Sequence, residues 1–168
     1  AGSDTSLCLG DSLQLNATVY VNGTYAWTPT SGLSNPVVSN PMLIPVSSAQ
    51  YICNVNAYGC SNADTFMVDV NGPVNASFTS SSGSLTLNFN GSVAGATGFQ
   101  WSFGDGTTDT VSLQPVHTYQ NDSVWIVCLF AYNDCFSDTF CISVDLTGVG
   151  VQETSLQSVQ VADFADHW

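Results

Sequence analysis

The chain is 168 residues long and carries 13 acidic residues but no lysine or arginine, which gives a formal net charge of −13. Without fixed cations it cannot hold nucleic-acid phosphates, and anionic membrane surfaces repel it, so we expect neither nucleic-acid binding nor membrane insertion. Apolar residues make up 44% of the chain, enough to build cores, yet no apolar stretch approaches the roughly 18 residues of a membrane-spanning helix. Six cysteines favour an oxidising compartment, and without a recognisable signal peptide we expect Ala1 to begin a mature secreted chain.

Residues 1–71 are predicted to form a first β-domain. Apolar and polar residues alternate along short stretches, a period of two that is typical of half-buried strands. The expected strands and turns are, in order, Ser6–Leu9, a strand through Leu13, Leu15 and Ala17, an Asn22–Gly23 hairpin turn, Tyr25–Trp27, Tyr51–Val55 and Thr65–Val70. Four prolines from Pro29 to Pro45 leave room only for short edge pieces in that stretch.

Residues 72–146 are predicted to form a second β-domain. The connection Asn71–Gly72–Pro73 is too short to act as a flexible spacer, so we expect the two domains to keep a restricted relative orientation. Alternating apolar positions mark its first strands, namely Val74, Ala76 and Phe78, then Leu85, Leu87 and Phe89, then Phe99, Trp101 and Phe103. A further strand is expected over Val124–Tyr132.

An internal repeat supports two copies of one architecture. The segment Tyr58…Asp64-Thr-Phe66 matches Tyr132…Asp138-Thr-Phe140 with the same internal spacing. Short strands with turn signals and no helical periodicity predict an all-β fold of two tandem β-sandwiches, followed by a short tail at 147–168.

Three stretches carry resemblances to known families. Trp101-Ser-Phe-Gly-Asp-Gly106, then Pro115-Val-His-Thr-Tyr119 and a strand, resembles the PKD domain, an immunoglobulin-like β-sandwich of extracellular proteins. The first domain resembles the Ig/PKD-like repeats of secreted Bacteroidetes adhesins, including gliding-motility adhesins, in Leu7-Cys-Leu-Gly-Asp-Ser-Leu13 and Gly59-Cys60-Ser61. The tail is similar in Ser158-Val-Gln-Val161 to the lead-in of the type A sorting domain of type IX secretion. It departs from that family afterwards, because the Pro-Asn-Pro turn is missing.

The resemblance implies one disulfide, and a hairpin implies another. In the adhesin repeats the cysteines of the two quoted motifs pair, which carries over to Cys8–Cys60. Cys128 and Cys141 are symmetric about a turn, so they face each other across a hairpin, and the family often has this pattern. We therefore predict a second disulfide, Cys128–Cys141.

Two cysteines remain without a predicted partner. Cys53 points inward and is expected to be a buried thiol, although pairing of Cys53 with Cys8 stays open. Cys135 lies at a loop tip, where it is either free or cross-links chains.

Motifs that suggest chemistry have structural interpretations in this chain. Asp105 and Asp109 supply too few oxygens for Ca²⁺, so the Gly104–Gly106 stretch is predicted to be a turn. His117 is expected to be a structural residue of the PKD motif, and His167 a solvated side chain, because two distant histidines do not make a zinc site. No nucleophile motif accompanies them. We predict no enzyme activity, no metal and no cofactor.

The strand Val124–Tyr132 is apolar on both faces. Its inward side chains are Trp125, Val127, Leu129 and Ala131, and its outward ones are Val124, Ile126, Phe130 and Tyr132, where the resembling family carries threonines. A strand that is apolar on both faces is normally covered on both. The candidates for cover are the first domain, the C-terminal tail or another subunit. We predict that the four outward residues form an interface.

The sequence thus predicts a non-catalytic extracellular structural or adhesive protein. The leading interpretation is a subunit of a bacterial cell-surface fibre, assembled by sandwich packing and strand pairing between copies. A surface glycan is a second expected class of partner. The alternative function is a substrate- or carbohydrate-binding accessory module of a secreted hydrolase, which the outward Phe130 and Tyr132 keep open.

Overall fold

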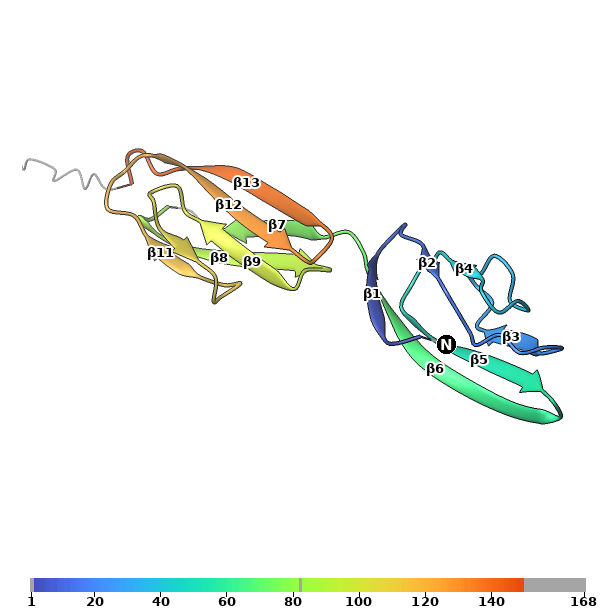
Figure 1. Ribbon diagram of the computed structural model, residues 1–168. Coiled ribbons are helices and arrows are strands. Elements are labelled where there is room, and N and C mark those ends of the chain that lie inside the picture. The colour runs from blue at the N-terminus through green and yellow to red at the C-terminus, as the bar shows by residue number, and fades with distance from the viewer. Residues whose placement is uncertain (1, 82, 150–168) are drawn as a thin grey trace, which may run out of the picture.

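The computed structural model describes residues 2–81 and 83–149, and these residues form two β-sandwiches placed end to end (Figure 1). The strands are β1 (Thr5–Cys8), β2 (Leu13–Gln14), β3 (Thr24–Thr28), β4 (Met42–Leu43), β5 (Ala49–Ala57), β6 (Cys60–Asn71), β7 (Asn75–Ser80), β8 (Thr86–Ala94), β9 (Gly98–Ser102), β10 (Thr108–Asp109), β11 (Val116–Thr118), β12 (Val124–Tyr132) and β13 (Ser137–Asp145). Over the described ranges the chain forms no helix of the length and apolarity that crossing a membrane requires.

The first sandwich packs the sheet β1-β6-β5-β3 against the two-stranded sheet β2-β4. Strands β5 and β6 form a long hairpin, closed by Tyr58 and Gly59, both at positive φ. The predicted strand through Leu13, Leu15 and Ala17 is only partly a ladder, because the N–H groups of Leu15 and Ala17 bond to the carbonyls of Pro41 and Ser39 in a proline-rich loop.

The second sandwich packs the sheet β10-β9-β12-β13 against β11-β8-β7. Trp101 is fully buried and its indole N–H donates to the Ser112 carbonyl at 3.0 Å. The first sandwich repeats this arrangement, since the buried Trp27 donates to the Val38 carbonyl at 2.8 Å, at the same separation along the chain. Burying such rings and satisfying their one polar atom is what fixes each core. The predicted all-β fold with two tandem sandwiches is therefore observed.

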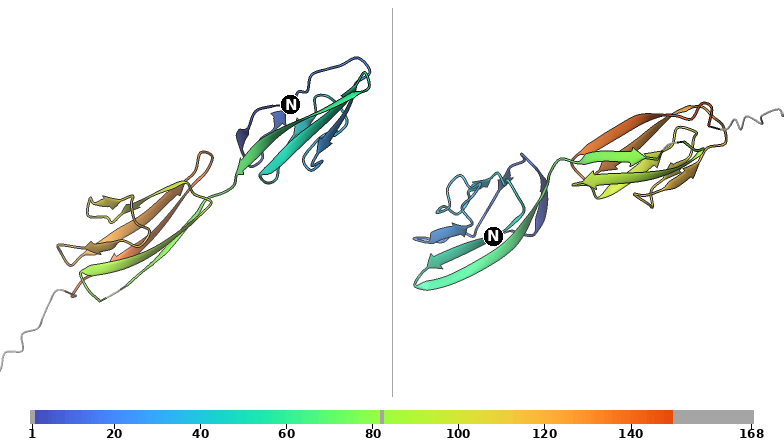
Figure 2. Two further views of the ribbon diagram at one scale, coloured as in Figure 1. Left: turned by 90° about the horizontal axis from the view of Figure 1, so that it is seen from below. Right: turned by 180° about the vertical axis from the view of Figure 1, so that it is seen from behind.

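The first strands of the two sandwiches pair differently. Strand β7 pairs antiparallel with β8, in the sheet that faces β12 and β13. Strand β1 instead pairs parallel with β6, and so joins the sheet of the long hairpin. Figure 2 shows the consequence from two further sides: β1 lies along the part of β6 nearest the second sandwich.

The disulfide Cys8–Cys60 that the resemblance implied is not formed. Parallel pairing places Cys8 opposite Asn71, at one end of β6, whereas Cys60 begins that strand at the other end. Eleven steps of about 3.3 Å separate these two ends, far more than the roughly 6 Å between the Cα atoms of a disulfide. Cys8 is bonded instead to Cys135, with Cα atoms 5.5 Å apart, and Cys60 is a free exposed thiol. The open alternative, Cys53–Cys8, is not formed either, because Cys53 is a free buried thiol.

Candidate functional site: an apolar stripe and an interdomain clamp

The outward side chains of β12 form a stripe that we call the apolar stripe: Val124, Ile126, Phe130 and Tyr132. Their exposed fractions are 50, 55, 37 and 44%. The neighbouring strands present polar residues on the same face, since Ile126 lies opposite Ser143 and Phe130 lies between Thr139 and Gln100. The stripe is therefore one strand wide and bordered by polar side chains.

Two aromatic rings dominate one end of the stripe. The rings of Phe130 and Tyr132 are stacked, with centroids 5.5 Å apart and planes at 27°. Tyr132 lies against Gly98 of β9, where a Cβ would come within 2.5 Å of the tyrosine ring. A Cβ at this position would collide with the ring, so glycine lets Tyr132 lie against β9, and both stacked rings are partly exposed.

The stripe has no cover among the described residues, as its exposed fractions show. The first domain, one of the three predicted covers, therefore does not bury it. The second predicted cover, the tail from residue 150 onward, lies outside the described residues. Whether the stripe is an interface between subunits stays a prediction.

At the middle of the stripe, Cys128 is bonded to Cys141, the pairing expected from the sequence. The two residues lie directly opposite each other in the antiparallel ladder. The bond braces β12 against the edge strand β13, so the backbone that carries the stripe is held flat.

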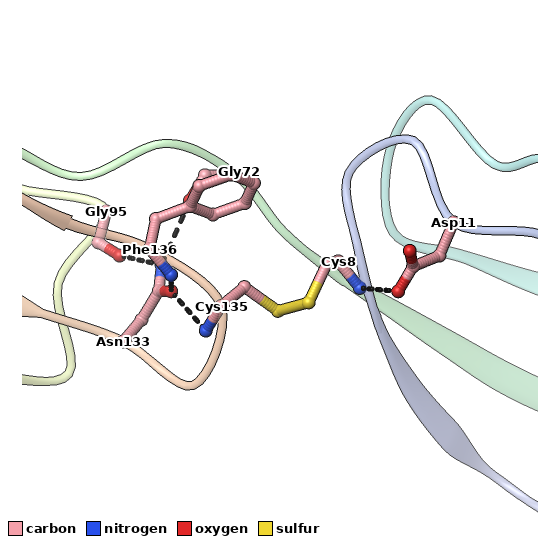
Figure 3. The surroundings of a disulfide bond; sticks show 7 residues. All are labelled: Cys8, Asp11, Gly72, Gly95, Asn133, Cys135 and Phe136. Atoms are coloured by element: carbon pink, nitrogen blue, oxygen red, sulfur yellow. Dashed lines mark hydrogen bonds between the residues drawn. A yellow bond between two sulfur atoms is a disulfide. The ribbon is translucent and has the colours of Figure 1, made fainter.

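A second disulfide, Cys8–Cys135, joins the two sandwiches (Figure 3). Asn133, at 8% exposure, organises the loop that presents Cys135. Its side-chain amide donates to the carbonyls of Gly72 and Gly95 at 2.9 and 2.8 Å, and its side-chain oxygen accepts from the N–H groups of Cys135 and Phe136. The β12–β13 loop is thus fixed to the linker at Gly72 and covalently to the first sandwich.

The sequence did not predict this interdomain clamp, by which we mean the disulfide Cys8–Cys135 and the bonds of Asn133 that support its loop. The signal that could have found it was the cysteine left over at the loop tip, Cys135, together with a linker too short to separate the domains. Asn133 gave no signal of its own, because its role depends on two carbonyls far from it in sequence.

Asp105 and His117, which suggested chemistry, form a closed structural pair. The His117 Nε2–H donates to the Asp105 carboxylate at 2.7 Å, and the Thr107 hydroxyl donates to the other carboxylate oxygen at 2.6 Å. Burial opposes ionisation of Asp105, but the hydrogen bonds from Thr107 and His117 outweigh it and lower its pKa to about 2. The His117 ring stacks on Phe103 with centroids 4.2 Å apart.

Tyr119 and Asp109, which lie near this pair, also bond within the chain. The Tyr119 hydroxyl donates to the Phe103 carbonyl at 2.9 Å, and burial, with a smaller contribution from the charge of Asp105, raises the pKa of Tyr119 to about 12. Asp109 accepts from the N–H groups of Val111 and Ser112. Within residues 2–81 and 83–149, no three His, Cys, Asp or Glu side chains cluster in a way that would hold a metal ion. His167 lies outside the described residues.

Comparison with known proteins identifies the fold. Residues 72–147 match the family model of the PKD domain, and no curated protein matches the sequence. Among solved structures, the amphioxus IgVJ-C2 molecule is 12% identical with a TM-score of 0.56, covering 84% of this chain and 99% of that one. Sidekick-1 immunoglobulin domains 1–4 are 14% identical with a TM-score of 0.60, covering 86% of this chain and 47% of that one. The titin I-band fragment I67–I69 is 14% identical with a TM-score of 0.56, covering 85% and 62%.

At these identities the structural likeness shows the fold alone. The three structures each match more than four fifths of this chain, so the likeness spans both sandwiches. The chain therefore has the fold of two tandem Ig-like sandwiches, of which the second matches the PKD domain model. Function has to be argued from surfaces, because such sandwiches carry many unrelated activities.

Proposed function

We propose that this chain is a non-catalytic extracellular structural protein that associates with copies of itself into a surface fibre. The observation that carries the proposal is the apolar stripe, exposed along a central strand of an otherwise polar sheet. Monomeric proteins rarely leave contiguous apolar surface in water without using it. The resemblance to Bacteroidetes adhesin repeats supports a bacterial cell surface as the location and type IX secretion as the route.

The architecture suits a load-bearing module. The disulfide Cys8–Cys135 and the bonds of Asn133 to the linker hold two sandwiches as one rod. The Asp105 carboxylate accepts from both His117 and Thr107, which supports a scaffold rather than a reaction centre.

A second copy is the partner that we infer for the stripe. Every fixed side-chain charge is negative, and a copy offers no cationic side chain to pair with them. Association must then rely on apolar contact against a background of repulsion. Burying Ile126 and Phe130 fully contributes about 1.5–3 kcal/mol each, and somewhat less here because both are already partly covered. Salt should strengthen this association, because it screens the repulsion.

The test replaces two stripe residues by the threonine found in the resembling family, as Ile126→Thr with Phe130→Thr. The full chain should form filaments or discrete oligomers in negative-stain microscopy and light scattering, and the variant should lose side-by-side association, giving thinner or smaller particles with an unchanged far-UV spectrum. A matched control, Ser143→Ala on the same face beside the stripe, should assemble normally. Intact assembly of the double variant would contradict the proposed interface.

The stacked pair Phe130 and Tyr132 favours a second candidate, a carbohydrate-binding accessory module of a secreted hydrolase. Sugar rings pack on exposed aromatic faces of this kind, and the two rings lie 5.5 Å apart on an open sheet. Affinity electrophoresis in gels containing polysaccharide separates the two functions. A chain that stays monomeric in salt and is retarded by polysaccharide would replace the fibre proposal by this one.

A further inference from the structure

In the second sandwich, strand β7 covers the inner face of the long β12–β13 hairpin. Strand β7 pairs with β8 from Asn75–Ala94 to Ser80–Phe89 and lies over the inner face of β12 and β13. The Phe78 ring meets the Phe140 ring with centroids 5.3 Å apart, and the Ala76 N–H donates to Asp138 at 2.8 Å. One strand thus closes this end of the sandwich.

The first sandwich has the same edge, but among the described residues no strand pairs with it. The bonds Leu15 N–H to Pro41 and Ala17 N–H to Ser39 repeat those of Phe89 to Pro115 and Gly91 to Leu113, each displaced by the same distance along the chain. Residues 15–20 therefore correspond to residues 89–94, which pair with β7. Because β1 pairs with β6 instead, no described strand lies along residues 15–20. Val19 and Val21 are 75 and 71% exposed there.

An open groove of about 510 Å³ occupies the place where that strand would lie. The hairpins of the two sandwiches can be aligned through their buried tryptophans, because Trp27 lies opposite Cys53 just as Trp101 lies opposite Leu129. In that register five hairpin residues that line the groove match residues of the β12–β13 hairpin, over whose strands β7 lies: Cys53, Val55, Ala57, Cys60 and Asn62 match Leu129, Ala131, Asn133, Phe136 and Asp138. Ala17, Thr18 and Tyr20 form the opposite wall.

One hydroxyl stands in for the missing strand. The Tyr25 hydroxyl accepts from the Tyr20 N–H and donates to the Thr18 carbonyl, both at 3.0 Å. At the corresponding position the second sandwich has Phe99, which offers no hydroxyl, and there β7 supplies the ladder. Two backbone groups of this edge are thus satisfied by a side chain rather than by a paired strand.

We propose that this groove is an acceptor for a β-strand, and that the strand is donated by residues 150–168 of a second copy. The described chain reaches Val149 at the end of the second sandwich away from the first, whereas the groove lies by the β5–β6 tip at the opposite end of the rod (Figures 1 and 2). The donor segment is much longer than the six residues of β7. It contains Ala162-Asp-Phe164, which repeats the spacing of Ala76-Ser-Phe78 in β7. Strand addition of this kind gives head-to-tail contacts that extend without closing.

This inference deepens the proposed function, on which it rests for the partner being a second copy. The apolar stripe would join rods side by side, and the groove would join them end to end. The two contacts use different residues, so each can be tested without the other.

Protection of Cys60 tests the groove on single chains. The full chain carrying Ala162→Asp with Phe164→Asp has a disabled donor segment, and its exposed Cys60 should react readily with N-ethylmaleimide, as mapped by mass spectrometry. A peptide of residues 150–168 should slow this alkylation at least tenfold, and a peptide with the same two substitutions should not. No protection would overturn the inference, as would a Cys60 already protected in the disabled chain, since another segment then fills the groove.

Two groove variants, each made in the disabled full chain, separate binding from folding. Ala57→Trp fills the groove and should abolish protection by the peptide, while Asn56→Trp, on the outer face of the same strand, should leave it unchanged. Tyr25→Phe removes the competing hydroxyl and should tighten peptide binding several-fold. Unchanged binding to Ala57→Trp, or weaker binding to a folded Tyr25→Phe chain, would overturn the inference. Stripe variants that still associate side by side while the peptide protects Cys60 would count against the stripe alone.

Discussion

The two sandwiches share a buried tryptophan and a long hairpin, yet they differ in how far the inner face of that hairpin is covered. In the second sandwich β7 covers the inner face of β12–β13, and the outer face carries the apolar stripe. In the first sandwich the outer face of β5 ends in the exposed polar residues Asn54 and Asn56, and the inner face borders a groove. The pairing of one short first strand decides whether the inner face is closed.

The comparison also shows that core size and surface use are linked. Among the described residues, the buried apolar cluster of the second sandwich has nearly twice as many members as that of the first. A sandwich that lacks one covering strand buries less apolar surface, so it has less stability to lose.

The largest effect should come from removing the two tryptophans in turn. Trp101→Ala and Trp27→Ala should each cost about 3–5 kcal/mol, because a large fully buried ring leaves a cavity. Guanidinium unfolding followed by circular dichroism measures the loss. Trp27→Ala should unfold the first sandwich already in water, while Trp101→Ala leaves a residual transition. Equal behaviour of the two variants would show that the smaller cluster does not limit the first sandwich.

Removing the disulfides one at a time should separate their two roles, since one stabilises the second sandwich and the other joins the two sandwiches. Cys128→Ser with Cys141→Ser opens a short hairpin loop and should destabilise the second sandwich by about 2–3 kcal/mol in denaturant unfolding. Cys8→Ser with Cys135→Ser should instead free the relative orientation of the sandwiches. In small-angle X-ray scattering, the fitted ensemble should then cover a wider range of radii of gyration. An unchanged scattering profile would mean that the bonds of Asn133 to the linker suffice.

Acid should weaken the second sandwich more than the first. Folding lowers the pKa of Asp105 from 3.8 to about 2, so its carboxylate stabilises the folded state fully above about pH 4, and this contribution is lost as the pH falls through about 2. The first sandwich has Ser31 at the corresponding position. Amide-resolved hydrogen exchange between pH 4 and 2 should show the extra loss in β9 to β11, and Asp105→Asn should remove that pH dependence.

The smallest effect is expected from Gly98→Ala. Its Cβ would come within 2.5 Å of the Tyr132 ring, which lies on the surface and can turn away, so the cost should be about 0.5–1 kcal/mol. The near-UV spectrum should change because the stacked pair with Phe130 is disturbed. A cost above about 2 kcal/mol would show that Tyr132 is held more tightly than its 44% exposure indicates.

The sequence predicted most of the fold, because alternation and turn residues act locally. The facing of Cys128 and Cys141 followed from their symmetry about a turn, which needs no long-range information. The Cys8–Cys60 pairing failed because nothing local specifies whether a first strand pairs with the second strand or runs parallel to the last. That choice depends on tertiary packing.

The strand register of the two hairpins was a second feature that the sequence did not predict. The Asp-Thr-Phe motifs at 64–66 and 138–140 are displaced from each other by the same distance as the two tryptophans. Cys53 and Leu129, which lie opposite those tryptophans, are two positions further apart. Such a shift keeps every side chain on its own face, so alternation alone cannot detect it. The groove therefore depends on hydrogen bonding between strands, which alternation does not specify. The stripe, in contrast, needed only the alternation along β12.

The bond between Cys8 and Cys135 also determines how the chain carries tension. A pull applied at the two ends of the polypeptide passes from β1 through the two sulfurs directly into the β12–β13 loop and out along β13. The residues between these cysteines, a separation of 127, lie outside that covalent path and cannot be drawn out while the bond is intact. The linker, the groove and most of both cores are thereby shielded from mechanical load.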